Sequence, residues 1–140
     1  MRAKQQAFTL IELMIVVAVV GILARIAYPM YVKQVVKGSS TAAQSQLMEP
    51  SNLQEKIYLN SSNYASSVDG LYTGKSDGGL GVTSSTTNDA RYTLSLSPTA
   101  SASYTLTAGP VAGTTQEGDG DLSIDSSGQR IWTGSPTGHW

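Results

Sequence analysis

The chain has 140 residues and a formal net charge of −1, from nine basic and ten acidic side chains. It has no cysteine, which excludes thiol catalysis, cysteine-based zinc sites and stabilisation by disulfides. Residues 53–140 carry eight acidic and four basic side chains, so the second half is acidic. General attraction of this half to nucleic acid is not expected, although a local basic strip is compatible with the composition.

Residues 1–7 form a short polar leader with two basic side chains and no acidic one. Positive charge resists translocation, so this end should stay in the cytoplasm while the chain beyond the next segment crosses the membrane. A secretory signal peptide carries its small-residue cleavage site after the apolar core, whereas Ala7 lies before it. Cleavage after Ala7 would leave the apolar segment on the mature chain.

The segment from Phe8 to Val32 is mostly apolar. Its roughly 25 residues would form a helix of ~37 Å, enough to cross a hydrocarbon core of ~30 Å. Two charges interrupt the segment. Glu12 lies near its start, and a carboxylate inside hydrocarbon normally marks a partner or a function. Arg25 lies near its other end, from which a long side chain can extend toward the lipid headgroups.

The stretch AFTLIE at residues 7–12 resembles the class III signal of type IV pilins, which are N-methylated filament subunits. The resemblance implies that a prepilin peptidase cuts between Ala7 and Phe8 and that the new terminal amine is methylated. It extends through Gly21 and Pro29, which fall where pilins carry residues that loosen the helix. Together these motifs are specific to the family.

Two residues depart from the pilin pattern. Pilins almost always have Gly before the cut, so Ala7 implies slower processing. Pilins are usually uncharged in this segment after the Glu, so Arg25 is unusual there. Neither departure changes the assignment that the resemblance implies.

The carboxylate of Glu12 also has a physical role that the residues themselves suggest. Cleavage before Phe8 creates an ammonium one helical turn away, so the two charges can neutralise each other within a subunit or between subunits. A buried ion pair adds little net stability but penalises misaligned packing, because a slip leaves a charge unpaired. We expect Phe8, Glu12 and Leu13 to guide filament assembly. The alternative is a solvated acid that the helix dipole favours.

Helical periodicity continues past the apolar segment. Five apolar side chains share an arc of about 120° at 100° per residue, and this stripe should pack on a sheet. They are Val36, Ala43, Leu47, Leu53 and Ile57. Pro29 and Pro50 each remove a backbone donor, so gentle kinks are expected. Alternatively, Pro50 ends the helix.

Residues 60–89 are rich in Ser, Asn, Gly, Thr and Asp, which predicts a long surface connection held at a few apolar positions. These anchors are Tyr64, Leu71, Tyr72, Leu80 and Val82. The glycines at 78–81 lack the Lys-Ser/Thr sequence of a phosphate-binding loop. We therefore expect no phosphate site in this connection.

The remaining chain predicts an antiparallel sheet. Apolar and polar side chains alternate over 92–96 and 104–108, and shorter apolar runs follow at 122–124 and 131–132. Turns are expected at 97–100 and 126–128, which gives about four strands with one half-buried face. The predicted fold class is α+β, namely the type IV pilin fold. In it a long N-terminal helix, transmembrane and then amphipathic, packs on a four-stranded β-meander.

The back half resembles PilE-type minor pilins, in which a Tyr-Thr-Leu-Thr-Ala stretch, here 104–108, precedes a final hairpin. Related chains usually have two cysteines that bracket this hairpin. Asp119 and His139 occupy the equivalent places. The resemblance therefore implies that an Asp–His contact, or no contact at all, replaces the disulfide as a hairpin clamp.

Other chemistry has little support in the sequence. With one histidine and no Gly-x-Ser-x-Gly motif, no hydrolytic triad can be assembled and no enzyme activity is expected. Four residues have the early spacing of a calcium loop, namely Asp119, Asp121, Ser123 and Asp125. Gly is absent from the sixth position, however, and Arg130 replaces the bidentate Glu, which favours a solvated acidic turn. No metal and no cofactor is expected.

These features predict a cleaved cytoplasmic leader (1–7), a transmembrane and assembly helix (8–32) and a periplasmic or extracellular head (33–140). The predicted function is a structural type IV pilus subunit, with a minor pilin favoured over a major one. Expected partners are other pilin subunits, the prepilin peptidase, the inner-membrane assembly platform and, before assembly, inner-membrane lipid. The protein should move from the inner membrane to the extracellular filament.

Adhesion, twitching motility or DNA uptake would be properties of the assembled fibre, and the sequence does not choose among them. Two alternatives to an ordinary pilus subunit stay open. One is a pseudopilin of a type II secretion system. The other is a DNA-binding receptor pilin, which would need an exposed basic strip and has weak support in this acidic chain.

Overall fold

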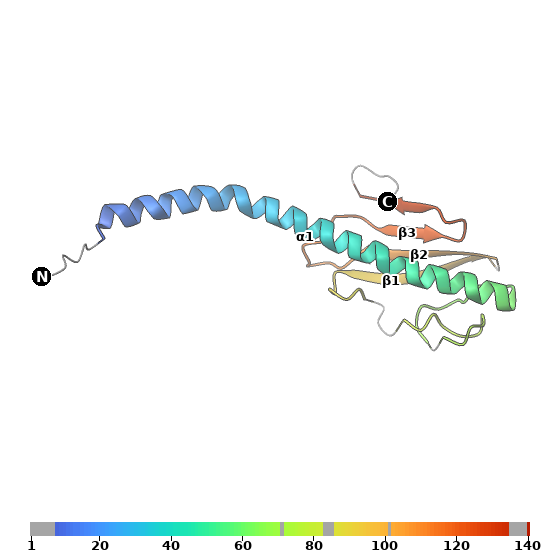
Figure 1. Cartoon of the computed structure of the whole chain (residues 1–140). Helices are drawn as coiled ribbons and strands as arrows, with labels where there is room; N and C mark the ends of the chain where they lie inside the picture. The colour runs from blue at the N-terminus through green and yellow to red at the C-terminus, as the bar shows by residue number, and fades with distance from the viewer. Residues whose placement is uncertain (1–7, 71, 83–85, 101, 135–139) are drawn as a thin grey trace, which may run out of the picture. The chain divides into compact units, whose positions relative to one another are not determined.

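The computed structural model describes residues 8–70, 72–82, 86–100, 102–134 and 140 (Figure 1). In chain order its elements are α1 (Leu10–Ser61), β1 (Tyr92–Ala100), β2 (Ser103–Pro110), β3 (Leu122–Asp125) and β4 (Arg130–Trp132). The chain divides into two units, Met1–Val35 and Val36–Trp140, and α1 contributes to both. From here on, "head" means Val36–Trp140.

Helix α1 is a single element of 52 residues, and neither Pro29 nor Pro50 ends it. The alternative in which Pro50 ends the helix is therefore wrong. Pro50 itself is buried, so packing around it offsets the lost backbone hydrogen bond. The helix ends at Ser61, and Ser62 adopts a left-handed φ of 55° while its amide donates to the Tyr58 carbonyl at 2.8 Å. This is a helix-ending turn that usually carries Gly or Asn.

The four strands form one antiparallel sheet in the order β1-β2-β3-β4, as the alternating pattern predicted. Leu94 pairs with Ala108 and Leu106 with Ile124, so apolar residues lie opposite each other across the strands. The turn expected at 126–128 is confirmed by a hydrogen bond of 2.9 Å from the Gly128 amide to the Asp125 carbonyl.

The turn expected at 97–100 is wrong. Strand β1 continues through this stretch, with Pro98 opposite Tyr104 and Ala100 opposite Ser103, and the register shifts between Pro98 and Ala100. β1 is an edge strand. A proline is tolerated in an edge strand because an amide on the outer side of the strand has no neighbouring strand to which it could donate, so its loss costs no hydrogen bond of the sheet. The proline therefore marks an irregularity in an edge strand instead of the end of the strand.

One face of the sheet packs against the part of α1 that belongs to the head (Figure 1). The predicted apolar stripe is confirmed at four of its five residues, since Ala43, Leu47 and Ile57 are completely buried and Leu53 is partly buried against the same core. The fifth, Val36, is partly buried and is not among the residues of this core. The sheet contributes the inward side chains of β1, β2 and β3. These are Tyr92, Leu94, Tyr104, Leu106, Ala108, Leu122 and Ile124.

The connection from α1 to β1 is held at several points. Leu80 is buried as predicted, whereas Tyr64 and Val82 are partly buried and Tyr72 is 37% exposed. Leu71 lies outside the described residues. The pattern missed two small anchors of this connection, Ala65 and Val68, which are also buried.

A buried glutamine of α1 fastens this connection. Gln54 is fully buried, and its amide nitrogen donates to the Ala65 carbonyl at 3.0 Å while its amide oxygen accepts from the Ala65 amide at 2.9 Å. The two bonds satisfy both backbone groups of one loop residue. The side chain thus replaces a backbone partner for a segment that has no strand neighbour at this point.

We expect Gln54→Ala to lower the free energy of unfolding of the head by about 2 kcal/mol or more, because each buried backbone group left without a partner costs about 1–3 kcal/mol. Urea unfolding of the full chain in detergent micelles, followed by tryptophan fluorescence, measures this. Gln44→Ala is the control, since Gln44 lies on the same helix and no described hydrogen bond involves its side chain. Equal losses in the two variants would contradict the role of the clamp.

Candidate functional site

The candidate assembly segment is residues 8–32, the apolar part of α1 and the two residues before it. Ala7, on one side of the expected cleavage, lies outside the described residues, whereas Phe8 is described and 79% exposed. Thr9 immediately precedes the helix. Phe8 is therefore exposed two residues before the beginning of α1.

The side chain of Glu12 closes the first turn of the helix. Its Oε2 atom accepts from the Thr9 amide and from the Thr9 hydroxyl, both at 3.0 Å, and the Glu12 amide donates to the Thr9 hydroxyl at 3.3 Å. This reciprocal pattern is a capping box. The sequence signal, Thr-x-x-Glu before an apolar run, was present but was not used in predicting the role of Glu12.

The capping box and the expected ion pair do not exclude each other. The described hydrogen bonds of the Glu12 carboxylate all involve Oε2, so Oε1 can still accept from an ammonium group. The helix cap orients the carboxylate, and a second subunit can add its own charge. The role of Glu12 between subunits stays a prediction that the single chain does not test.

The assembly segment exposes its apolar side chains on all sides. Among the described residues, α1 is the one helix long and apolar enough to cross a membrane. Leu13, the third predicted assembly residue, is 57% exposed, and most of its apolar neighbours are at least as exposed. A surface of this kind marks contact with lipid or with another protein.

The two residues expected to loosen the helix lie inside it. A side chain at Gly21 would meet nothing within 4 Å, so packing in the single chain gives no reason for a glycine there. Pro29 is also helical. Their loosening role concerns a different state of the helix and stays a prediction.

A polar cluster joins α1 to the loop between β2 and β3. The amide nitrogen of Gln116 donates to Tyr92 Oη at 2.9 Å and lies 2.8 Å from Asp119 Oδ2 and 3.1 Å from Ser40 Oγ. The Tyr92 hydroxyl donates to Asp119 Oδ2 at 2.6 Å, and the Ser40 hydroxyl also bonds this atom. Gln116 reaches the Val36 carbonyl as well, at 3.1 Å. We call Ser40, Tyr92, Gln116 and Asp119 the polar cluster.

The polar cluster controls the ionisation of Tyr92. Desolvation in the core and the hydrogen bond to the Asp119 carboxylate raise the pKa of Tyr92 to about 12. In the unfolded chain a tyrosine titrates near pH 10. Between these values the unfolded chain has lost the proton that the fold still holds, so folding stability falls as the pH rises.

We therefore expect the head to lose stability between about pH 10 and pH 12, and we expect Tyr92→Phe to weaken this decline. The variant should be less stable at neutral pH, because Asp119 and Gln116 each lose a buried partner, but its stability should depend less on alkaline pH. Denaturant unfolding of both proteins across this range measures the difference. Equal slopes would show that Tyr92 does not carry the alkaline transition.

The predicted hairpin clamp cannot be followed to its second residue, because His139 lies outside the described residues. The described contacts of the Asp119 carboxylate are those of the polar cluster. Its backbone carbonyl accepts from the Trp132 indole N–H at 2.6 Å. At Asp119 the loop between β2 and β3 is thus fastened to α1 by the side chain and to β4 by the backbone.

The four residues with calcium-loop spacing do not converge. Asp119 contributes to the polar cluster, whereas Asp125 Oδ1 accepts from the amides of Ser127 and Gln129 at 2.9 Å each. The Ser127 hydroxyl is the largest cause that lowers the pKa of Asp125. Among the described residues no group of three acidic or histidine side chains is placed to hold a metal.

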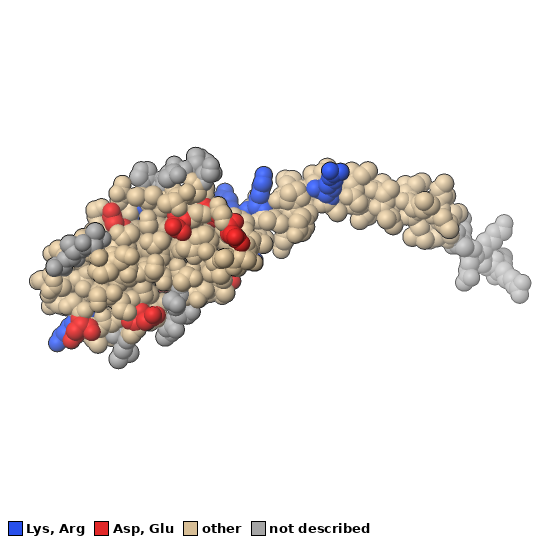
Figure 2. Space-filling view, turned by 180° about the vertical axis from the view of Figure 1, so that it is seen from behind, with Lys and Arg blue, Asp and Glu red and all other residues tan. Residues whose placement is uncertain are grey.

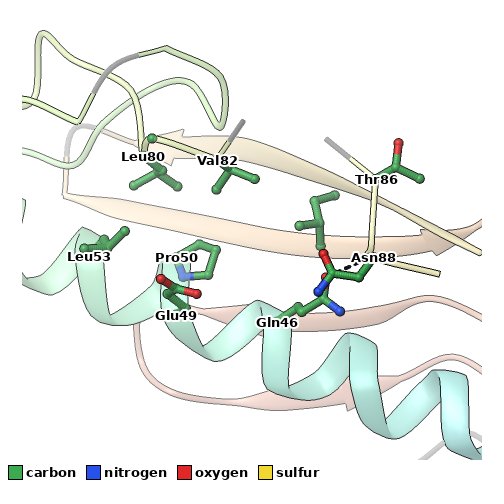
Figure 3. Close-up of a pocket in the computed structure, with 10 residues that line it drawn as sticks. Gln46, Glu49, Pro50, Leu53, Leu80, Val82, Thr86 and Asn88 are labelled. Carbon is green, nitrogen blue, oxygen red and sulfur yellow. Dashed lines mark hydrogen bonds between the residues drawn. The ribbon is translucent and has the colours of Figure 1, made fainter. Parts of the chain in front are cut away.

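A pocket of about 280 Å³ lies between α1 and the connection to β1 (Figure 3). Its helix side is formed by Gln46, Glu49, Pro50 and Leu53, and the opposite side by residues of the connection and Leu94. The backbone amide of Asn88 donates to Gln46 Oε1 at 3.3 Å across the pocket. The described lining offers a carboxylate, amides and a hydroxyl but no histidine, so it lacks the base of a hydrolytic triad.

The described surface of the head is mixed in charge. Figure 2 shows acidic side chains at several separate places on one face of the head and fewer basic ones. Arg91 is engaged in hydrogen bonds within the head. Its guanidinium donates to Ser39 Oγ at 3.0 Å, and its backbone amide donates to Asp89 Oδ1 at 3.3 Å. Desolvation raises the pKa of Asp89, but hydrogen bonds from Thr87, Ser39 and Arg91 outweigh it and lower the pKa.

Two family models match the chain. The model of the prokaryotic N-terminal methylation motif matches residues 2–28. The model described as type IV minor pilin ComP, DNA uptake sequence receptor, matches residues 29–122. Together they cover the assembly segment, the rest of α1 and most of the sheet.

Several curated relatives are similar to this chain. The type IV major alpha-pilin of Moraxella bovis is 36% identical over 110 residues, which covers 59% of this chain and 68% of the relative. A fimbrial protein of Pseudomonas aeruginosa is 42% identical over 64 residues, or 46% of this chain and 42% of the relative. The type IV major fimbrial protein FimA of Dichelobacter nodosus is 48% identical over 46 residues, so this chain spans 30% of its length.

The chain therefore belongs to the type IV pilin family, in the branch that the ComP minor-pilin model describes. The resemblance to type IV pilins and the α+β pilin fold are confirmed. The model that matches the head is that of ComP minor pilins, and a nearer likeness to PilE-type minor pilins stays a prediction.

Proposed function

We propose that this protein is a minor structural subunit of a type IV pilus and not an enzyme. Residues 8–32 would hold the precursor in the inner membrane with residues 1–7 in the cytoplasm. A prepilin peptidase would cut between Ala7 and Phe8, and the apolar helices of many subunits would then form the core of an extracellular fibre. The observation that carries this proposal is the exposed apolar start of α1, with a carboxylate in its first turn.

Mass spectrometry of the mature amino terminus, taken from fibres sheared off the cells, tests the processing step. We expect a chain that starts at Phe8 with a methylated amine. An intact Met1 in functional fibres would contradict the proposal. A strain that lacks the protein should lose or shorten its pili, whereas a loss of protein secretion with normal pili would favour the pseudopilin alternative.

A second candidate function, reception of DNA by the fibre, is favoured by one observation. The ComP model, whose description names a DNA uptake sequence receptor, matches residues 29–122, which are 94 of the 140 residues. The acidic composition of the head does not support general DNA binding, so any binding would rest on a local arrangement of the few cations. Lys56 and Lys75 are exposed and are the first candidates.

A gel shift with the full chain in detergent tests this second function. We expect a complex with duplex DNA that weakens steeply as salt rises, because phosphate contacts release counterions. Lys75→Gln should weaken it if that lysine contacts a phosphate. Absence of a complex even at low salt would refute the DNA function without affecting the role as a fibre subunit.

A further inference from the structure

The outer end of the assembly segment contains a cation that needs a partner. Among residues 8–32 the charged side chains are Glu12 and Arg25. They lie 13 positions apart, which is about 20 Å along a helix, so they cannot pair within one chain. In the proposed fibre subunit, Glu12 is committed to the terminal ammonium. Arg25 therefore requires an anion from outside the segment.

The depth of Arg25 follows from the length of the helix. With Phe8 at the inner boundary of a ~30 Å hydrocarbon core, the outer boundary falls about 20 residues later, near Tyr28. Arg25 then lies ~4 Å below this boundary, within reach of its long side chain. Lys33 lies ~7 Å above the boundary, and the lean of helix side chains toward the N-terminus directs it back toward the boundary. Arg25 has to extend against this lean, which the length of its side chain permits. The two cations bracket the level of the phosphates.

The positions around the helix agree with this depth. Arg25 and Lys33 are two i,i+4 steps apart and are therefore separated by about 80° around the axis. Both are exposed in the single chain. Tyr28 and Tyr31, which are 71% and 68% exposed, lie at the same level, and tyrosines are enriched at membrane interfaces because their rings are amphipathic. The two cations, the two tyrosines and the length of the helix therefore all place the outer lipid headgroups beside the same part of α1.

We propose that Arg25 and Lys33 together bind the phosphate of an anionic phospholipid in the outer leaflet of the inner membrane, with Tyr28 and Tyr31 beside the glycerol backbone. This proposal rests on the proposed membrane-held precursor. The assembly segment of a second copy is a poorer partner, because its one acid is Glu12, which is already committed. The lipid contact would fix the depth of the helix before the subunit is drawn into a fibre.

Spin-labelled lipids in bilayers that contain the full chain test the proposal. The measured quantity is the fraction of labelled phosphatidylglycerol, relative to labelled phosphatidylcholine, that is immobilised at the protein surface. We expect a preference of up to about fivefold for the anionic lipid, which is the effect that one cation near a membrane surface contributes. Arg25→Gln should remove most of this preference, and Arg25→Lys should keep most of it.

Arg130→Gln is the matched control, since it makes the same chemical change at a residue of β4 in the head and should leave the preference unchanged. Inorganic phosphate that replaces chloride in the buffer at constant ionic strength, so that screening does not change, should also leave it unchanged. Loss of the preference on adding phosphate would indicate a site for free phosphate and would overturn the lipid proposal. An unchanged preference in Arg25→Gln would overturn it as well.

A separate label distinguishes the two proposals. Because the chain has no cysteine, Ala18→Cys provides a single site for a nitroxide whose access to oxygen reports its depth. A label outside the hydrocarbon would refute the membrane-held precursor and with it the lipid site. A label inside the hydrocarbon without any lipid preference would refute the lipid site alone. Loss of fibres in Arg25→Gln with unchanged lipid preference would assign Arg25 to a subunit contact instead.

Discussion

Glu12→Gln is expected to reduce incorporation of the subunit into wild-type fibres to less than about a tenth, because the terminal ammonium of a neighbouring subunit then lies in an apolar core without a counter-charge. The variant keeps an oxygen that can accept from the Thr9 amide and hydroxyl, so the helix cap survives in part. Tagged variant and wild-type protein are produced in the same cells, and their ratio in sheared fibres is measured by mass spectrometry.

Thr9→Val is the matched control for this experiment. It removes the hydroxyl that caps the helix and keeps the carboxylate of Glu12, and the loss of a helix cap is a modest effect. We expect this variant to be incorporated at close to the wild-type level. Strong exclusion of Thr9→Val would show that capping controls assembly, and normal incorporation of Glu12→Gln would refute the role of the charge. Both variants must be shown to be cleaved before Phe8.

Leu47→Ala is expected to lower the free energy of unfolding of the head by about 2–5 kcal/mol, the usual cost of a cavity in place of a buried leucine. Leu47 is 0% exposed and packs between α1 and the sheet. Leu59→Ala makes the same chemical change on the same helix at a side chain that is 83% exposed. It should cost less than about 0.5 kcal/mol.

Denaturant unfolding of the full chain in detergent compares the two leucines directly. Trp132 packs against the core and reports its loss by fluorescence. Similar losses for both variants would show that α1 does not pack on the sheet along the predicted stripe. A large loss for Leu59→Ala alone would place a partner on the far side of the helix.

The fold was predictable because its main signals are periodic. The 3.6-residue stripe through Ala43, Leu47 and Ile57 and the two-residue alternation in β1 and β2 each specify an element and its buried face. The continuation of α1 through Pro50 was left open, since a proline alone does not show whether packing will offset its lost hydrogen bond. The extension of β1 through Pro98 was missed for a related reason, because only the position at the sheet edge makes it tolerable.

The polar contacts were less predictable. Gln116 and Ser40 are 76 positions apart, and no periodic pattern links two single polar residues at that distance. Their meeting depends on how the loop after β2 folds back on α1, which is a tertiary property. The capping box differs, because Thr9 and Glu12 are three positions apart and a local rule describes their contact.

The polar cluster and the Trp132 contact fasten the loop between β2 and β3 without any covalent bond. A pilin head closed in this way needs no oxidant and no disulfide isomerase to reach its final form, so its maturation should be limited by chain folding and not by thiol chemistry. Reducing agents would have no bond to break in it. The subunit can therefore reach its folded form independently of disulfide-forming enzymes.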